Sequence, residues 1–137
     1  MTSSELFDLA VQARENSYSP YSGFRVGAAL LTADGSVYTG CNIENAAFTP
    51  TVCAERVAIF KAVSDGQTDF VEIAVAGGAD EVADGVFPCG VCRQVMVEFC
   101  NSDFKVTVKV GGLIATYRLD EIIPYSFSGD DLKGENA

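Results

Sequence analysis

Three cysteines in two short segments place the strongest constraint on how this chain can fold. Cys53 begins the segment CAER at residues 53–56, and Cys89 and Cys92 belong to the segment PCGVC at residues 88–92. Thiolates bind zinc readily, and a catalytic zinc site needs three protein ligands and an open fourth position. We therefore expect a fold that brings the two segments together, with Glu55 near the open position to transfer protons.

Like their composition, the positions of these segments in the chain favour metal binding. Both lie at the N-termini of predicted helices, where oriented N–H groups favour negative charge and lower the pKa of a thiol. In open α/β sheets, functional sites collect where helix N-termini meet strand ends. The pattern therefore indicates a thiolate site between two helix starts.

The composition narrows the chemistry that the chain can carry out. Its 137 residues include no histidine, so neither Ser-His-Asp nor Cys-His catalysis can be built within it. Proton transfer near neutral pH is left to a carboxylate, a thiol or a metal-bound water. The formal net charge is −10 and no Lys/Arg cluster offsets it, which argues against a nucleic-acid partner.

The cysteine count and the apolar runs bear on compartment and size. Five cysteines, an odd number, suit a reduced compartment better than a disulfide framework. No apolar run reaches the length of a membrane span and no charged-then-apolar leader opens the chain, so we expect a soluble, cytoplasmic protein without a membrane partner. The length suits one domain over residues 1–137, with an acidic tail from about residue 128.

Hydrophobic periodicity and turn residues predict alternating helices and strands. The helices are expected from a Ser3 or Ser4 cap to about Asn16, from a Thr51 cap to about Asp65, and over 89–100, with a helical turn at 120–123. The strands are expected over 24–31, 37–41, 70–76 and 104–110, with a fifth ending near Arg118. The helix over 51–65 is apolar nearly all round, so we expect it both in the core and in an oligomer interface.

The connections between the strands set the topology of the expected sheet. The turn at Asp34-Gly35 makes a hairpin of the first two strands. The short Gly111-Gly112 connection leaves no room for a crossover, so the last two strands must be antiparallel. The predicted fold class is therefore α/β, a three-layer α/β/α arrangement around a five-stranded mixed sheet with strands 4 and 5 antiparallel.

Simpler interpretations of the cysteines stay open at this point. Cys89 and Cys92 could form a redox pair, or all three cysteines could hold a closed structural zinc with Cys41 as the fourth ligand. Cys100 is too far from Cys92 for that role, at roughly 12 Å along one helix. The structural-zinc interpretation leaves Glu55 without a function.

The other candidate residues also have ordinary alternatives. Arg56 could be a solvated helix charge, or it could donate to the sulfurs of a three-thiolate zinc site and withdraw part of their charge. Phe24 could be a core residue, and Asn42 and Glu44 could be loop polars.

Beyond the cysteine segments, longer stretches of the chain match one family. A ligand-x-Glu segment followed by Pro-Cys-x-x-Cys is typical of zinc deaminases, with Cys53 here in the place that histidine holds in other members. The chain closely resembles the small, homotetrameric, three-cysteine cytidine deaminases. The matching segments, in the order of the family, are residues 18–30, 40–47, 53–56 and 88–94.

The resemblance implies a cytidine deaminase-like fold and a full set of site residues. It assigns one zinc per subunit to Cys53, Cys89 and Cys92, and proton transfer to Glu55. It implies hydrolysis of cytidine and 2′-deoxycytidine to uridine and 2′-deoxyuridine plus ammonia, in pyrimidine salvage. The substrate contacts that it implies are Phe24 on the pyrimidine ring, Asn42 and Glu44 on the ribose hydroxyls, the Ala54 backbone on the base, Phe48 near the ribose, and Ala46, Ala47 and Phe127 lent by neighbouring subunits of a homotetramer.

The chain departs from the family pattern at two positions. Phe48 stands where tyrosine is usual, and Phe87 stands where serine or threonine is usual. A deaminase of another substrate, such as a base in tRNA or an antibiotic nucleoside, is the competing hypothesis, and a non-enzymatic zinc protein is another. The acidic charge argues against the nucleic-acid version, and the pair Asn42 and Glu44 favours a free ribose.

Overall fold

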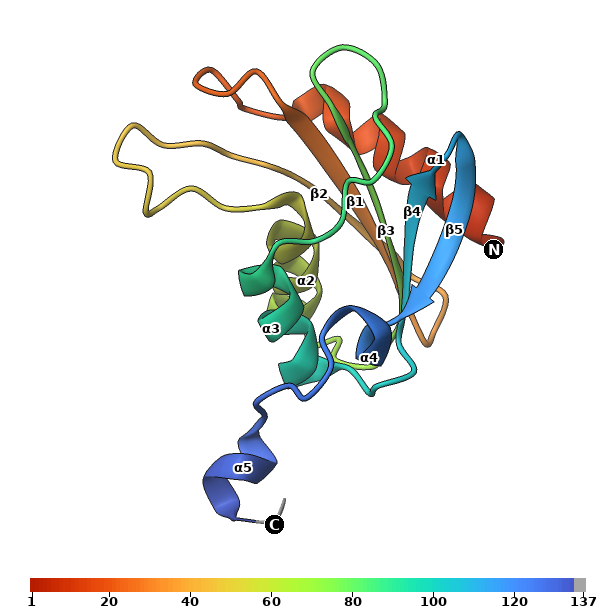
Figure 1. Ribbon diagram of the computed structural model, residues 1–137, viewed down its shortest axis with the longest axis vertical. Helices are drawn as coiled ribbons and strands as arrows, with labels where there is room; N and C mark the ends of the chain where they lie inside the picture. The colour runs from red at the N-terminus through yellow and green to blue at the C-terminus, as the bar shows by residue number, and fades with distance from the viewer. Residues whose placement is uncertain (135–137) are drawn as a thin grey trace.

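A five-stranded mixed sheet forms the centre of the structure, a computed structural model that describes residues 1–134 (Figure 1). The strand order is β2-β1-β3-β4-β5. The strands are β1 (Arg25–Thr32), β2 (Val37–Cys41), β3 (Phe70–Gly78), β4 (Lys105–Val110) and β5 (Leu113–Arg118). β1 pairs antiparallel with β2 and β3, β3 runs parallel to β4, and β4 pairs antiparallel with β5. The predicted mixed sheet and its antiparallel last pair are confirmed.

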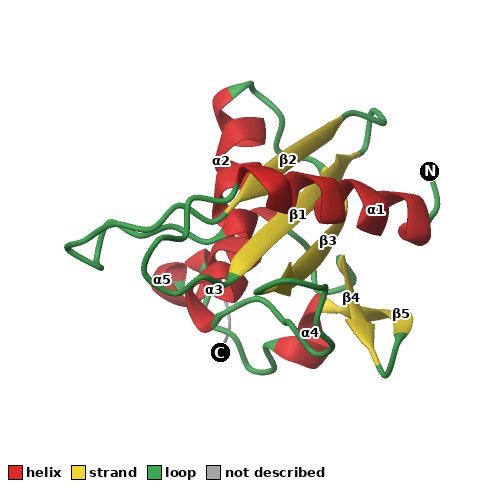
Figure 2. Ribbon diagram, turned by 90° about the horizontal axis from the view of Figure 1, so that it is seen from above, coloured by secondary structure: helices red, strands yellow, loops and turns green. Residues whose placement is uncertain are grey.

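Helices cover both faces of this sheet, which makes the predicted three layers (Figure 2). α1 (Ser3–Ala13) packs on one face, where Leu6, Phe7 and Ala10 meet the small residues Ala29, Ala74 and Ala76. α2 (Ala54–Ser64) and α3 (Gly90–Phe99) pack on the other. The larger core on that face includes Leu30, Ala58, Ile59, Ile73, Met96 and Val106.

Two glycines let the helices approach the sheet closely. A Cβ on Gly27 would lie 2.0 Å from the Ala10 carbonyl oxygen, and a Cβ on Gly40 would lie 2.4 Å from the Ala54 carbonyl oxygen. Only glycine fits such contacts. Gly40 therefore seats the first turn of α2, the turn that follows Cys53, directly on β2.

The start of α1 differs from the prediction. Thr2, rather than Ser3 or Ser4, caps the helix, because only Thr2 has an acidic residue three positions later. The Glu5 amide donates to the Thr2 hydroxyl at 3.1 Å, and the Glu5 carboxylate accepts from Thr2 in return. The helix also ends at Ala13, and the residues up to Asn16 form a 3₁₀ turn.

The predicted N-cap of α2 was also wrong, by two residues. Cys53 rather than Thr51 occupies the N-cap, because the preceding Val52 is extended and forms a bridge with Ile43. The Thr51 hydroxyl instead accepts from the Asn45 amide at 2.9 Å. The consequence for the site is that a metal-ligand candidate, not a threonine, stands at the helix start.

The C-terminal segment contains more regular structure than expected. α4 (Leu119–Ile122) takes the place of the predicted turn at 120–123. The tail predicted from about residue 128 includes a short helix, α5 (Gly129–Lys133), which lies away from the sheet (Figure 1). Residues 135–137 of that tail lie outside the described chain. Among residues 1–134, no helix has the length and apolarity that crossing a membrane requires.

The prediction for the apolar helix over 51–65 is confirmed in its core part. α2 buries Ala54, Glu55, Ala58, Ile59 and Ala62. Its Val57 and Phe60 line an open hollow with Tyr38 on the outer side, and Phe60 is exposed. The oligomer interface stays a prediction.

Candidate active site

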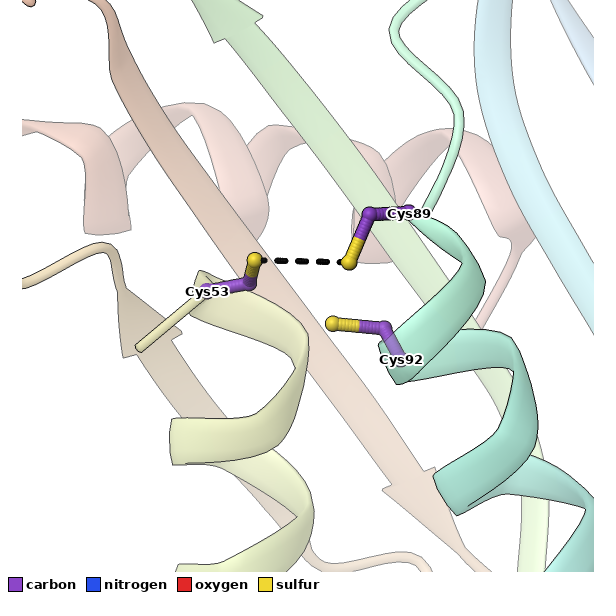
Figure 3. Close-up of side chains that lie close together, drawn as sticks. All are labelled: Cys53, Cys89 and Cys92. Atoms are coloured by element: carbon purple, nitrogen blue, oxygen red, sulfur yellow. Dashed lines mark hydrogen bonds between the residues drawn. The ribbon is translucent and has the colours of Figure 1, made fainter. Parts of the chain in front are cut away.

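The three cysteines of the two sequence segments meet at the starts of α2 and α3 (Figure 3). Cys53 is the N-cap of α2, Cys89 is the N-cap of α3, and Cys92 lies in the first turn of α3. Their sulfur atoms all lie within 4.8 Å of one another, and the Cys53 and Cys89 sulfurs are 3.6 Å apart. The fold therefore brings together three candidate ligands from two segments, with 36 positions between Cys53 and Cys89.

This geometry suits a tetrahedral zinc ion. With Zn–S bonds of about 2.3 Å, neighbouring sulfurs of a tetrahedral site lie about 3.8 Å apart. Within residues 1–134, no other group of three or more possible ligand residues gathers in this way, and Cys41 is not part of this one. The structural site with Cys41 as a fourth ligand is therefore not formed.

The electrostatics of the sulfurs favour at least one thiolate. A hydrogen bond from Cys92 lowers the pKa of the Cys53 thiol to about 5, and Arg56 and Cys89 add to that effect. The Arg56 Nη2 donates to the Cys53 sulfur at 3.4 Å, so Arg56 contacts the cluster rather than extending into solvent. By contrast, burial raises the pKa of Cys100 to about 12, which keeps that thiol protonated.

Glu55 lies beside the sulfurs in the first turn of α2 and is only 3% exposed. The pKa of its carboxyl is raised to about 7, chiefly by burial and also by the charge of Cys53, while a backbone hydrogen bond and Arg56 oppose the change. A carboxyl group with a pKa near the working pH can both accept and return a proton. This arrangement is the one that acid–base catalysis requires.

A cavity of about 360 Å³ opens above Glu55 and the thiols. Its size falls in the range of small-molecule sites. Cys53, Glu55 and Cys89 line it, and Ser22, Asn42, Glu44 and Thr51 bring the other polar groups. The apolar walls come from Phe24, Val26, Val52, Ala54, Val75, Val86 and Phe87.

Asn42 and Glu44 shape the segment that carries Phe24. The Asn42 side chain donates to the Phe24 carbonyl at 2.8 Å and accepts from the Val26 amide at 2.9 Å. The Glu44 carboxylate accepts from two consecutive backbone amides, those of Tyr21 and Ser22, at 3.0 Å each. Both residues line the cavity while they hold its aromatic wall.

The comparison with known proteins decides the family. A family model described as the cytidine and deoxycytidylate deaminase zinc-binding region matches residues 1–108. The chain belongs to this deaminase family. Its three-cysteine cluster is the group in the described residues that could hold the zinc ion of that region.

Individual relatives support this family assignment. A cytidine deaminase from Halalkalibacterium halodurans is 50% identical over 124 residues, which cover 90% of this chain and 92% of that protein. A crystal structure of cytidine deaminase from Burkholderia pseudomallei, 42% identical, superposes with a TM-score of 0.85 and covers 93% of this chain and all of that one. A blasticidin-S deaminase from Bacillus cereus is 35% identical over 75% of this chain and 76% of its own length.

Four residues that the family resemblance assigned to substrate lie outside the deaminase cavity of this chain. Ala46 and Ala47 are exposed on the loop between β2 and α2, which projects from the body (Figure 1). Phe48 is 73% exposed on the same loop, and its ring packs on that of Tyr21 with 6.4 Å between centroids. Phe127 is 58% exposed. The contribution of Ala46, Ala47 and Phe127 to a neighbouring subunit's site stays a prediction, as does a position of Phe48 near the ribose.

The deaminase cavity also has lining residues that the sequence analysis did not single out. They are Ser22, Val26, Thr51, Val52, Val75 and Val86. Ser22 stands in the family segment over residues 18–30, which was the available signal. The valines have the pattern of ordinary strand and core residues, so nothing local in the sequence distinguishes them.

Proposed function

We propose that this chain hydrolyses cytidine and 2′-deoxycytidine to uridine and 2′-deoxyuridine with release of ammonia, using one zinc ion per subunit. The observation that carries the proposal is a buried carboxyl, Glu55, beside a three-thiol cluster whose Cys53 and Cys89 line a nucleoside-sized cavity together with Glu55. The relatives named cytidine deaminase support the same reaction. A role in pyrimidine salvage, in the reduced cytoplasm, follows from that reaction as part of the proposal.

The cysteine ligands and Arg56 prepare the metal end of the cavity. When bound, zinc lowers the pKa of a water toward neutrality and so supplies the nucleophile for C4 of the base. Three thiolates would leave the centre with a net charge of about −1. The guanidinium of Arg56, which donates to the Cys53 sulfur, withdraws part of that charge.

Glu55 moves the protons of the reaction. Its buried carboxyl takes the proton that the attacking water loses, and passes it to N3 of the base. The same carboxyl then moves the second proton of that water from the new hydroxyl on C4 to the exocyclic amino group. The C4–N bond breaks, the amino group leaves as ammonia, and the oxygen of the water becomes O4 of uridine. The raised pKa of Glu55, about 7, lets one group serve as base and then as acid.

The other cavity residues orient the nucleoside. Phe24 packs against the pyrimidine, and the Ala54 backbone binds the base. Asn42 and Glu44 take the ribose hydroxyls with the hydrogen-bonding capacity that their backbone contacts leave. Phe48 does not line this cavity, and its phenyl ring lacks the hydroxyl that the family usually has near the ribose.

An ultraviolet assay of cytidine conversion, with and without prior chelation of the metal, tests the proposal. We expect turnover by the zinc-loaded protein and its loss after chelation, because the nucleophile depends on the ion. A zinc-loaded protein without turnover of cytidine or deoxycytidine would rule the activity out. Blasticidin S assayed beside them tests the antibiotic alternative that one relative suggests.

Nucleotides should be poor substrates in the same assay. Glu44 brings a carboxylate to the cavity, and within residues 1–134 no lysine or arginine lines it. Like charges placed together cost several kcal/mol, so CMP and dCMP should have kcat/KM values about a hundredfold below those of the nucleosides. Equal values would contradict the assignment of the ribose to the Glu44 end.

We also propose that the enzyme is a homotetramer whose sites are shared between subunits. Phe127, which is exposed and does not line the cavity of its own subunit, would reach a neighbouring site together with Ala46 and Ala47. The Phe127 carbonyl accepts from the Gln94 side chain at 2.7 Å, which ties the C-terminal segment to α3.

Replacing Phe127 with alanine tests this sharing. We expect KM for cytidine to rise about tenfold, because a buried aromatic contact is worth roughly 1–3 kcal/mol, while circular dichroism shows an intact subunit. The matched control is Leu132→Ala, which removes another exposed apolar side chain from the same C-terminal region. Unchanged kinetics in Phe127→Ala, or a monomeric mass in solution, would contradict the shared site.

A further inference from the structure

The segment over residues 84–88 forms one wall of the cavity without being part of a helix or strand. Val86 and Phe87 line the cavity, and Pro88 comes directly before the ligand candidate Cys89. Figure 1 shows the segment in green, where it passes from the end of β3 to the start of α3. Because it has no hydrogen-bond ladder of its own, its position depends on contacts with other elements.

Three contacts tie this segment to the β4–β5 hairpin. The Gly112 amide donates to the Asp84 carboxylate at 3.1 Å, and the Gly85 amide donates to the Lys109 carbonyl at 2.7 Å. The ring of Phe87 then meets the ring of Tyr117 on β5 edge to face, with 5.3 Å between centroids and 63° between planes. Such aromatic pairs contribute about 0.5–1.5 kcal/mol beyond the area they bury.

The other end of the segment is tied to the helical layer. The Arg93 Nε donates to the Pro88 carbonyl at 2.7 Å, and the same guanidinium donates to the Ile122 carbonyl. Phe87 is therefore the residue at which the hairpin-bound part of the wall joins the helix-bound part. Of the three contacts with the hairpin, the one between Phe87 and Tyr117 is nearest in sequence to Cys89.

We propose that Tyr117 is a positioning residue for the active site. It does not line the cavity, and it acts through the ring of Phe87 to hold both the cavity wall and the approach to Cys89. A displaced wall lowers catalytic efficiency, because a shift of about 1 Å at a site can cost up to a hundredfold in rate. A displaced Cys89 weakens metal binding, as loss of supporting contacts around a metal ligand does.

Kinetics and metal binding of Tyr117→Leu, measured on the zinc-loaded full chain, test the proposal. We expect kcat/KM for cytidine to fall about tenfold and zinc to transfer to a chelator at about tenfold lower chelator concentration. Tyr117→Phe keeps the ring and should stay within about twofold of the unmodified protein in both measurements. The part that uses turnover rests on the proposed deaminase function, whereas the zinc measurement does not.

A matched aromatic pair separates positioning from a general loss of stability. Phe70 and Phe99 pack with 6.2 Å between ring centroids and do not line the cavity. Phe99→Leu should lower the thermal midpoint about as much as Tyr117→Leu does, with zinc affinity and kcat/KM unchanged. Tyr117→Leu values that stay within twofold of the unmodified protein in both measurements would overturn the proposal.

Asp84→Ala provides a second, surface variant if Tyr117→Leu fails to fold. It removes only the acceptor for the Gly112 amide, so a smaller change of about threefold is expected in the same two measurements. Asp84→Asn retains an acceptor and should restore both. An Asp84→Ala protein with unaltered zinc affinity and kinetics would overturn the anchoring of the wall by the hairpin. If the unmodified protein shows no turnover, the proposed function fails and the zinc measurements still decide the role of Tyr117.

Discussion

Glu55→Gln should lower kcat for cytidine deamination by about a thousandfold while leaving zinc content and fold intact. Glutamine has nearly the same shape as glutamate, so the buried first turn of α2 can keep its packing. An amide cannot accept a proton and return it, however, and no histidine is present to replace it. The measurements are single-turnover and steady-state rates by ultraviolet absorbance, with zinc determined by elemental analysis.

Glu72→Gln is the matched control for this substitution. Glu72 is also a buried carboxylate, and it accepts a hydrogen bond from Thr107 at 2.6 Å. It lies on the same face of β3 as Ala74 and Ala76, because alternate residues of a strand point to one side. The side chains of Ala74 and Ala76 face α1 rather than the cavity. Replacing Glu72 should change kcat less than about twofold. If Glu55→Gln kept more than about a tenth of the activity, proton transfer would have to be assigned to another group.

Glu55→Gln should also make the metal-free protein more stable at alkaline pH. Burial raises the pKa of Glu55 from its ordinary 4.5 to about 7 in the folded chain, so the folded state binds the proton more tightly than the unfolded state does. The contribution of Glu55 to stability is therefore full below about pH 4.5 and is lost as pH rises through about 7. Glutamine does not titrate.

Urea unfolding of the two chelated proteins measures this difference. The gap in unfolding free energy should be near zero at pH 4.5 and grow to roughly 3 kcal/mol in favour of Glu55→Gln above pH 8. A gap that stayed constant with pH would show that Glu55 titrates normally in the folded chain. Opposite effects on activity and stability are expected of a group that is buried for catalysis rather than for packing.

The cysteine cluster was predictable because its determinants are local. Each segment combines ligand residues with a helix start, and the short Gly111-Gly112 connection fixed the pairing of β4 with β5 in advance. The predictions of the helix starts were less accurate. A cap at Thr51 would place Val52 inside the helix, but the bridge of Val52 to Ile43 keeps it extended, and nothing within the helix segment itself signals that pairing.

The walls of the cavity could not be predicted for a similar reason. Val26 and Val75 stand in strands that are apolar almost throughout, and only the antiparallel pairing of β1 with β3 brings them to the cavity. The contacts of Asn42 with the backbone of Phe24 and Val26 likewise depend on how β2 lies against β1. Sequence identifies the chemical groups, whereas the tertiary structure selects the surfaces that face the substrate.

Cys53→Ala should leave the protein without stably bound zinc and without measurable turnover. Cys53 is the only one of the three cluster ligands that α2 provides, since Cys89 and Cys92 both belong to α3. Its loss leaves two sulfurs on one helix, fewer than the three protein ligands of a catalytic zinc site. After dialysis we expect less than about a tenth of a zinc ion per chain.

Cys41→Ala is the matched control, because Cys41 is a partly buried thiol outside the cluster, and it should retain full zinc and activity. A metal held by the cluster would link α2 to α3, so zinc should raise the thermal midpoint of the unmodified protein and of Cys41→Ala by mass action. It should have no such effect on Cys53→Ala, in which the link between the two helices is missing. Full zinc content in Cys53→Ala would mean that the metal is held elsewhere, and the juxtaposition of the two helix starts would then need another explanation.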